Sequence, residues 1–117
     1  MKINMRQFKK WIEALDSGEH KQTKDTLQNY NGYCCMGVGC VVLVPKYKLR
    51  LQTDEDLIFG DTPEQQKEAP LWLKQIDRDF GKKTGGTMVQ QMNDDLNLTF
   101  PEIATMLELV YIHKAFD

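Results

Sequence analysis

The chain has 117 residues, of which 41% are hydrophobic and 27% are charged. These fractions are typical of a globular domain, and the length suffices to bury a core, so we predict a single compact domain over residues 1–117. The formal net charge of −2 gives no general electrostatic attraction to nucleic acid, which disfavours that class of partner.

We expect neither a signal peptide nor a membrane span. The first residues lead into a charged segment instead of the apolar core of a signal peptide, and the longest apolar run, which ends at residues 41–44, is too short to cross a bilayer. The cysteine count is three, an odd number, which indicates reduced thiols. These features predict a cytoplasmic protein.

The first predicted element is an amphipathic helix. Asn4 and Gln7 have the spacing of a capping box, and Gly18 supplies a stop. Residues 19–33 are polar and rich in turn formers, so we expect a loop with a short extended piece. The apolar stripe of the helix contains Met5, Phe8, Trp11, Ile12 and Leu15.

The next segment, residues 34–44, is apolar on every side, which indicates a buried element. Its periodicity does not separate a helix from a strand. The Asn31-Gly32 turn and the small residues favour a helix, whereas the valines at residues 41–44 favour a strand. We predict a buried helix that Pro45 ends.

Residues 47–69 are predicted to contain a hairpin and a further helix. Residues 47–52 alternate between apolar and polar side chains, as a half-buried strand does, and residues 57–59 can return beside them across an acidic turn. Thr62-Pro63 then begins a helix that Pro70 interrupts.

Two more helices are predicted between residues 71 and 96, joined by a flexible linker at residues 82–86. The first closes at Gly81, and Thr87 caps the second. The residues that we expect these two helices to bury are Trp72, Leu73, Ile76, Phe80, Met88, Val89, Met92 and Leu96.

The last helix has the clearest start, because Thr99 and Glu102 have the spacing of a capping box. Its predicted apolar face contains Ile103, Met106, Leu107, Val110 and Tyr111. The elements together predict an α+β fold: a predominantly helical domain of about five helices with one small β-hairpin and a central, buried Cys- and Gly-rich helix.

Two blocks of the sequence resemble a family of small bacteriophage and prophage proteins. The first, ALDSGEHKQ…LQNYNGYCCMGVGC, covers residues 14–40 and contains the patterns S-G-x-x-x-Q and Y-C-C-x-G-V-x-C. The second, MVQQMNDDLNLTFPEIATMLE, covers residues 88–108 and contains N-D…T-F-x-E-I-A. The chain departs from the pattern at Met36, Gly39 and Val41. The resemblance implies a phage origin, and hence the cytoplasm of a host cell, without implying a reaction.

The cysteines permit a catalytic interpretation. A thiol at a helix N-terminus can have a lowered pKa and act as a nucleophile beside a histidine base. If the protein is an enzyme, the residues are Cys34 and Cys35 with His113, although His20 is also available. Neither histidine lies in a recognisable base motif.

The favoured interpretation of the cysteines is a packed core. Reduced cysteines behave as small hydrophobic side chains, and Gly37 and Gly39 would let another backbone approach closely. A zinc site is disfavoured, because C-C-x-x-x-x-C lacks the paired spacing of zinc ligands. We therefore predict no catalytic residue, no metal and no cofactor.

The loop at residues 80–88, FGKKTGGTM, is the preferred position for a bound phosphate group. Lysines and glycines before a helix N-terminus can form an anion cradle of backbone amides, although the order differs from that of a P-loop. A mobile connection with solvated lysines is the simpler alternative. The candidate ligand-binding residues are Lys82, Lys83, Thr84, Gly85, Gly86 and Thr87, with Lys21 and Gln22 from the other polar loop.

Another polar group, Asn93-Asp94-Asp95, stands at the end of a predicted helix, where carboxylates oppose the helix dipole. We interpret these residues as local turn formers. The last helix extends its apolar face to Leu109, Ile112 and Phe116, which leaves both a monomer and a homodimer open.

Three functions remain in competition. The favoured one is a phage accessory protein that binds and neutralises a host component in counter-defence, either by inhibiting a host protein or by sequestering a small, phosphate-bearing nucleotide signal. The second is a small cysteine-dependent hydrolase. The third, a nucleic-acid-binding regulator, is disfavoured by the net charge.

Overall fold

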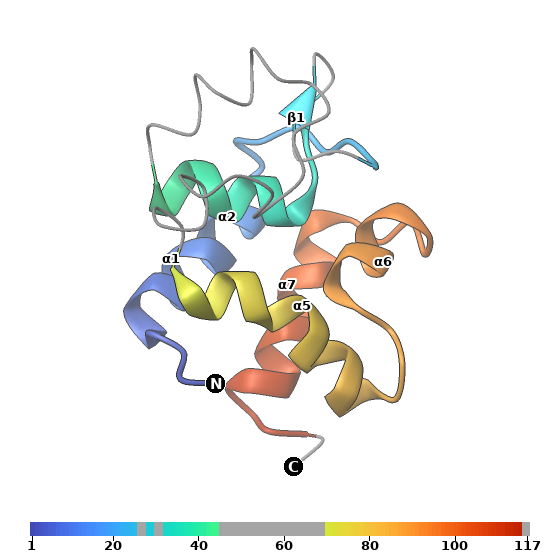
Figure 1. Ribbon diagram of the computed structural model, residues 1–117. Coiled ribbons are helices and arrows are strands. Elements are labelled where there is room, and N and C mark those ends of the chain that lie inside the picture. Colours follow the sequence, from blue (N-terminus) through green and yellow to red (C-terminus); the bar gives the residue numbers. More distant parts are fainter. Residues whose placement is uncertain (26–27, 30–31, 45–69, 116–117) are drawn as a thin grey trace.

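A computed structural model describes residues 1–25, 28–29, 32–44 and 70–115. This part of the chain contains five helices around one apolar core and a single antiparallel pair of short strands (Figure 1). The domain is therefore mostly helical, as predicted. The stop at Pro45, the hairpin at residues 47–59 and the helix that begins at Thr62-Pro63 lie outside the described residues.

Helix α1, Met5–Asp16, forms as its sequence pattern predicts. The Asn4 side chain accepts a hydrogen bond from the backbone N–H of Gln7, with Oδ1 and N 3.1 Å apart, and Gly18 has a φ of +75° just after the helix. Met5 is 38% exposed, although we placed it on the buried stripe. The buried residues of α1 are Phe8, Trp11, Ile12 and Leu15.

The following loop contains the predicted extended piece. Strands β1, Gln28–Asn29, and β2, Gly32–Tyr33, pair in antiparallel fashion, and Gln22 forms a separate parallel bridge with Tyr33. The backbone N–H of Tyr33 donates to the carbonyl of Lys21 over 2.7 Å. Residues 21–23 are thus held directly beside β2.

Helix α2, Cys35–Leu43, confirms that the cysteine- and glycine-rich segment is helical and central. Its residues from Cys35 to Cys40 are all buried, and the helix packs against α1. A Cβ added at Gly39 would lie 3.1 Å from Leu73 Cδ1 and 3.2 Å from Trp11 Nε1. The close approach that we predicted therefore exists at Gly39, but side chains make it rather than a backbone.

Helix α5, Leu71–Thr84, is longer than predicted. Our expected stop at Gly81 was wrong, because this glycine packs in the interior, where an added Cβ would lie 3.0 Å from Met88 Cγ. The helix ends at Gly85, whose φ of +85° is the left-handed conformation of a C-cap. Lys82 and Lys83 consequently lie in the last helical turn, and the predicted flexible linker shrinks to the residues that follow Thr84.

Helix α6, Val89–Asp94, begins one residue later than predicted, with Met88 rather than Thr87 as its N-cap. The Met88 backbone N–H donates to Gln91 Oε1 over 2.8 Å. Val89 and Met92 are buried as expected, whereas Leu96 is 55% exposed. The polar side chain of Asn93, which we did not expect in the core, is fully buried.

Helix α7, Phe100–Tyr111, confirms the predicted capping box. The backbone N–H of Thr99 donates to Glu102 Oε1 over 2.9 Å, and the backbone N–H of Glu102 donates to Thr99 Oγ1 over 3.3 Å. Helix α7 packs against α1. Its buried residues are Phe100, Ile103, Ala104, Leu107 and Val110.

Aromatic rings join three of these helices at the centre of the molecule. The Phe8 ring lies edge-on to Trp72 and to Tyr111, with centroids 6.1 Å and 5.9 Å apart, so α1, α5 and α7 meet at this residue. Trp72 Nε1 donates to Gln7 Oε1 over 2.7 Å, which satisfies the indole. In the described part of the chain, none of the helices combines the length and the apolar character that a membrane crossing requires.

Candidate functional site

The cysteine thiols lie in the core. Cys34 is the N-cap of α2, and its Sγ accepts a hydrogen bond from the backbone N–H of Gly37 over 3.4 Å. This is the helix position that the catalytic interpretation required. Burial nevertheless raises the pKa of Cys34 to about 12, because the contribution of the backbone amides is smaller than that of desolvation. Burial also raises the pKa of Cys35 and Cys40 well above the usual range.

Neither histidine is hydrogen-bonded to these thiols in the described part of the chain. The ring of His20 packs edge-on against Tyr33, with centroids 5.5 Å apart, and His113 is exposed just beyond the end of α7. The described residues contain no cluster of three or more His, Cys, Asp or Glu side chains that could hold a metal ion.

The predicted anion cradle at residues 82–87 meets competing internal contacts. The backbone N–H of Gly86 donates to the Gly81 carbonyl over 2.7 Å. At the start of α6, the backbone N–H of Gln90 donates to Asp77 Oδ1 over 2.9 Å. The Thr84 hydroxyl lies 2.8 Å from the carbonyl oxygen of Phe80. Several amides near the predicted cradle, including those of Gly86 and Gln90, are thus engaged, and a carboxylate of the chain itself lies at this helix end.

The pKa of Asp77 reflects this position. Burial raises it above the ordinary aspartate value, and the backbone amides of Gln90 and Val89 oppose that shift. An additional anion at the start of α6 would lie next to this carboxylate. This carboxylate therefore opposes the binding of an anion at the start of α6.

Lys21 and Gln22, the two candidate residues from the other polar loop, have different surroundings. Gln22 turns inward, where its Nε2 donates to Asn93 Oδ1 over 2.9 Å and to the Leu98 carbonyl over 2.7 Å. Lys21 is exposed. None of the described hydrogen bonds joins Lys21 or Gln22 to residues 82–87, so the combined site that we predicted is not assembled by these contacts.

A polar network forms around Asn93 that our sequence interpretation missed. Asn93 Nδ2 donates to the Thr23 carbonyl over 2.7 Å and to Asp94 Oδ1 over 2.8 Å. Asp94 Oδ1 also accepts the backbone N–H of Asp25 over 2.9 Å. We had assigned Asn93 and Asp94 to local turn formation, whereas they bind a loop about seventy positions earlier in the chain.

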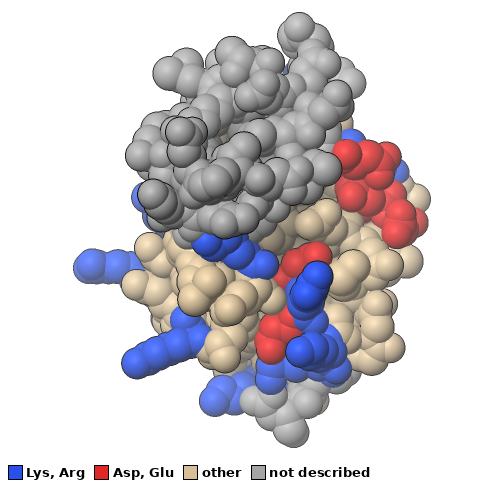
Figure 2. All heavy atoms as spheres, in the orientation of Figure 1, with Lys and Arg blue, Asp and Glu red and all other residues tan. Residues whose placement is uncertain are grey.

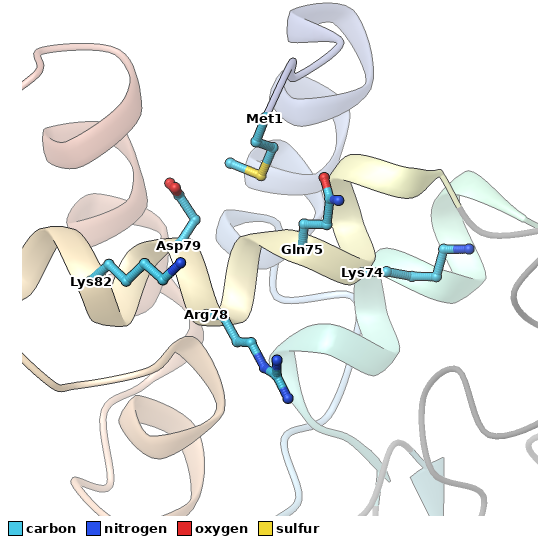
Figure 3. Close-up of a pocket in the computed structure, with 6 residues that line it drawn as sticks. All are labelled: Met1, Lys74, Gln75, Arg78, Asp79 and Lys82. Carbon is cyan, nitrogen blue, oxygen red and sulfur yellow. The ribbon is translucent and has the colours of Figure 1, made fainter.

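A hollow of about 550 Å³ lies on the outer side of α5 (Figure 3). We call it the α5 hollow. Figure 3 shows Gln75 and Asp79 on the same side of the helix as Met1, with Arg78 on the opposite side. The residues that line it are Met1, Lys74, Gln75, Arg78, Asp79 and Lys82.

Basic side chains outnumber acidic ones in the described lining of this hollow, where Lys74, Arg78 and Lys82 accompany Asp79. Asp79 Oδ2 accepts a hydrogen bond from the Tyr111 hydroxyl over 2.8 Å. The basic side chains of Lys74, Arg78 and Lys82 recur every fourth residue along α5. Figure 2 shows Lys and Arg side chains projecting from the lower part of this face, whereas the largest group of acidic side chains lies at its right edge.

The sequence contained a signal for this surface that we did not use. Lysine or arginine at positions 74, 78 and 82 has the spacing of one helix face. We interpreted α5 from its apolar residues alone. Because Asp77 and Asp79 lie between the basic residues in the sequence, we did not recognise a positively charged helix face. Only the structure shows that Asp77 and Asp79 are engaged by other elements.

The family comparison covers nearly all of the chain. A family described as "Domain of unknown function (DUF8296)" matches residues 1–111. No curated protein matches the chain, and no solved structure matches it. Function must therefore be argued from the geometry of the chain itself.

Proposed function

We propose a function for this chain, which belongs to the DUF8296 family: it binds and neutralises a host protein during phage infection, in the host cytoplasm. The resemblance of residues 14–40 and 88–108 to small phage proteins supports the phage setting. The proposal is one of binding by surface contact rather than of catalysis.

The observation that supports binding is the distribution of reactive groups. The three thiols are buried, and burial raises their pKa values, so the thiolate that a nucleophile needs is disfavoured. The charged side chains of α5, by contrast, line a hollow at the surface. The accessible chemistry of the described residues is thus electrostatic recognition.

Inhibition of a protein is better supported than sequestration of a nucleotide signal. The backbone amides of Gly86, Met88 and Gln90 are engaged, and Asp77 lies at the adjacent helix start. None of the described residues that line the α5 hollow is an aromatic residue on which a base could stack. A protein surface needs neither of these features, because it can meet the hollow through side chains alone.

The decisive experiment is affinity capture of the tagged chain from phage-infected host cells, followed by native mass spectrometry. We expect a host protein at a fixed stoichiometry that is absent from a parallel capture with an unrelated small phage protein. A small-molecule adduct without a host protein would instead support sequestration. A chain that emerges without either would contradict the proposal.

A further inference from the structure

We infer that the outer face of α5 is the partner-binding surface and that it recognises an acidic helical segment of a protein. This inference rests on the proposed function, because it names the site and the chemistry of the partner. The proposed surface consists of the lysine and arginine side chains of the α5 hollow together with Met1 and Leu71.

The first argument is the direction of the charges on α5. The helix carries two carboxylates, Asp77 and Asp79, and both have partners on other helices: the backbone N–H of Gln90 and the hydroxyl of Tyr111. Arg78, in contrast, is exposed and lines the hollow with Lys82. The described lining of the hollow thus combines three basic side chains with one carboxylate, and a partner with negative charge complements this positive balance.

The second argument is the spacing of the cations. Lys74, Arg78 and Lys82 are four residues apart, so successive Cα atoms rise about 6 Å along the helix axis. A partner helix with Glu or Asp at every fourth position presents carboxylates with the same repeat of about 6 Å. The guanidinium of Arg78 can hold one carboxylate through two parallel hydrogen bonds.

The third argument is the apolar area beside these charges. Leu71, one turn before Lys74, is 63% exposed, and the exposed Met1 lines the hollow. Methionine and arginine are enriched in protein interfaces, where an apolar centre is surrounded by charged side chains. A bare phosphate compound would leave this apolar area uncovered, so a protein segment fits the surface better.

The test uses a helical peptide in which glutamate occupies every fourth position, titrated into the ¹⁵N-labelled full chain while backbone amide shifts are recorded. The matched control peptide carries glutamine at the same positions. We expect the amide shifts to concentrate on residues 71–83, to be absent with the glutamine peptide, and to weaken as salt increases.

A charge-reversed pair of variants locates the site. Arg78→Glu combined with Lys82→Glu changes the outer face of α5, and the control pair Lys9→Glu with Lys10→Glu makes the same charge change at exposed positions of α1. We expect about a tenfold or greater loss of peptide affinity in the α5 pair and little loss in the control pair. Circular dichroism and the urea midpoint verify that both pairs are folded.

Several results would overturn the inference. These are an equal loss of peptide affinity in both pairs of variants, or backbone amide shifts centred away from α5. The inference also fails if the glutamate peptide does not bind, or if inorganic triphosphate binds more tightly than the peptide at equal salt. The capture experiment separates this inference from the proposed function. If the variant with Arg78→Glu and Lys82→Glu still captures the same host protein, the outer face of α5 is not the binding surface, but the proposed function stands. If the wild-type chain captures no host protein, the proposed function fails.

Discussion

Gln22 and Asn93 are 71 positions apart in the chain, and their side chains meet through a hydrogen bond of 2.9 Å from Gln22 Nε2 to Asn93 Oδ1. The other end of the Asn93 amide donates to the carbonyl of Thr23 over 2.7 Å. Asn93 is fully buried, so these bonds replace its contacts with water. They fasten the loop before β1 to the end of α6.

Replacing this asparagine is therefore expected to destabilise the domain. Asn93→Ala leaves the Thr23 carbonyl without a described partner and removes one acceptor of the Gln22 amide. We expect the free energy of unfolding to fall by about 1–3 kcal/mol, which urea denaturation followed by tryptophan fluorescence measures. Gln90→Ala, at an exposed position of the same helix, is the control and should change stability little. Equal stability of the two variants would contradict a role for the network.

Gly32 should tolerate an added side chain less well than Gly18 does. Its φ is +146°, and a Cβ there would collide with the backbone carbonyl group of Lys21. Gly18 also has a positive φ, of +75°, but an added Cβ meets nothing within 4 Å. We expect Gly18→Ala to cost about 1 kcal/mol for its backbone conformation, and Gly32→Ala to cost roughly twice that or more.

Comparing the two variants in urea tests the tighter surroundings and the larger φ of Gly32 against a glycine whose added Cβ would meet nothing within 4 Å. A larger loss in Gly32→Ala would show that the contact between β2 and Lys21 is tightly packed. A loss no larger than that of Gly18→Ala would contradict the prediction.

The parts of the fold that local patterns determine were predictable from the sequence. The cap of α1, the capping box of α7 and most of the buried stripe of these two helices follow from residues three or four positions apart. The end of α5 was missed because Gly81 has the composition of a stop, while its contact with Met88 is tertiary. The network around Asn93 was missed for the same reason.

The candidate site was harder to predict because it depends on where the fold places each charged side chain. Lys82 and Lys83 look like part of a loop cradle when the helix is thought to end at Gly81. Once α5 continues to Thr84, Lys82 joins Arg78 on the helix surface. The engagement of Asp79 by Tyr111 bridges 32 positions of sequence, and no local pattern indicates it.

The buried thiols predict a loss of stability at high pH. Burial raises the pKa of Cys34 from 9.0 to about 12, so between these values the unfolded chain releases a proton that the folded chain keeps. The stabilisation is complete below pH 9 and declines as the pH rises toward 12. We expect the urea midpoint to be steady from about pH 7 to pH 8 and to fall above pH 9.

The variant Cys34→Ala tests whether this thiol contributes. It should be less stable than the wild type at neutral pH, because it removes a buried side chain, and its midpoint should fall less steeply above pH 9. The native thiols should also resist a thiol reagent until urea unfolds the chain. Rapid modification of the folded protein would contradict the burial on which the proposed function relies.

The capping box of α7 should contribute measurably to stability. Thr99→Ala removes the hydroxyl that accepts the backbone N–H of Glu102, and we expect a loss of about 1 kcal/mol in the free energy of unfolding. Thr105→Ala is a suitable control, because Thr105 is exposed within the same helix, where alanine is favoured. The cap would be unimportant if Thr99→Ala were as stable as Thr105→Ala.

The hydrogen bond between Tyr111 and Asp79, beside the α5 hollow, should stabilise the domain. Burial raises the pKa of Tyr111, and the neighbouring Asp79 carboxylate raises it further, so the hydroxyl remains a donor. Tyr111→Phe should lower the free energy of unfolding by about 1 kcal/mol. It also leaves Asp79 without its described partner in the lining of the hollow.

Tyr111→Phe keeps the negative charge of Asp79, because the tyrosine hydroxyl is neutral, so this variant should bind the glutamate peptide about as tightly as the wild type. Asp79→Asn is the contrasting variant: it keeps an acceptor for the Tyr111 hydroxyl and removes the negative charge, so it should bind the peptide more tightly than the wild type. The amide-shift titration measures both affinities. If the two variants bind the peptide equally, Asp79 does not influence the hollow, and charge selection on the α5 face must be assigned to its lysines and arginine alone.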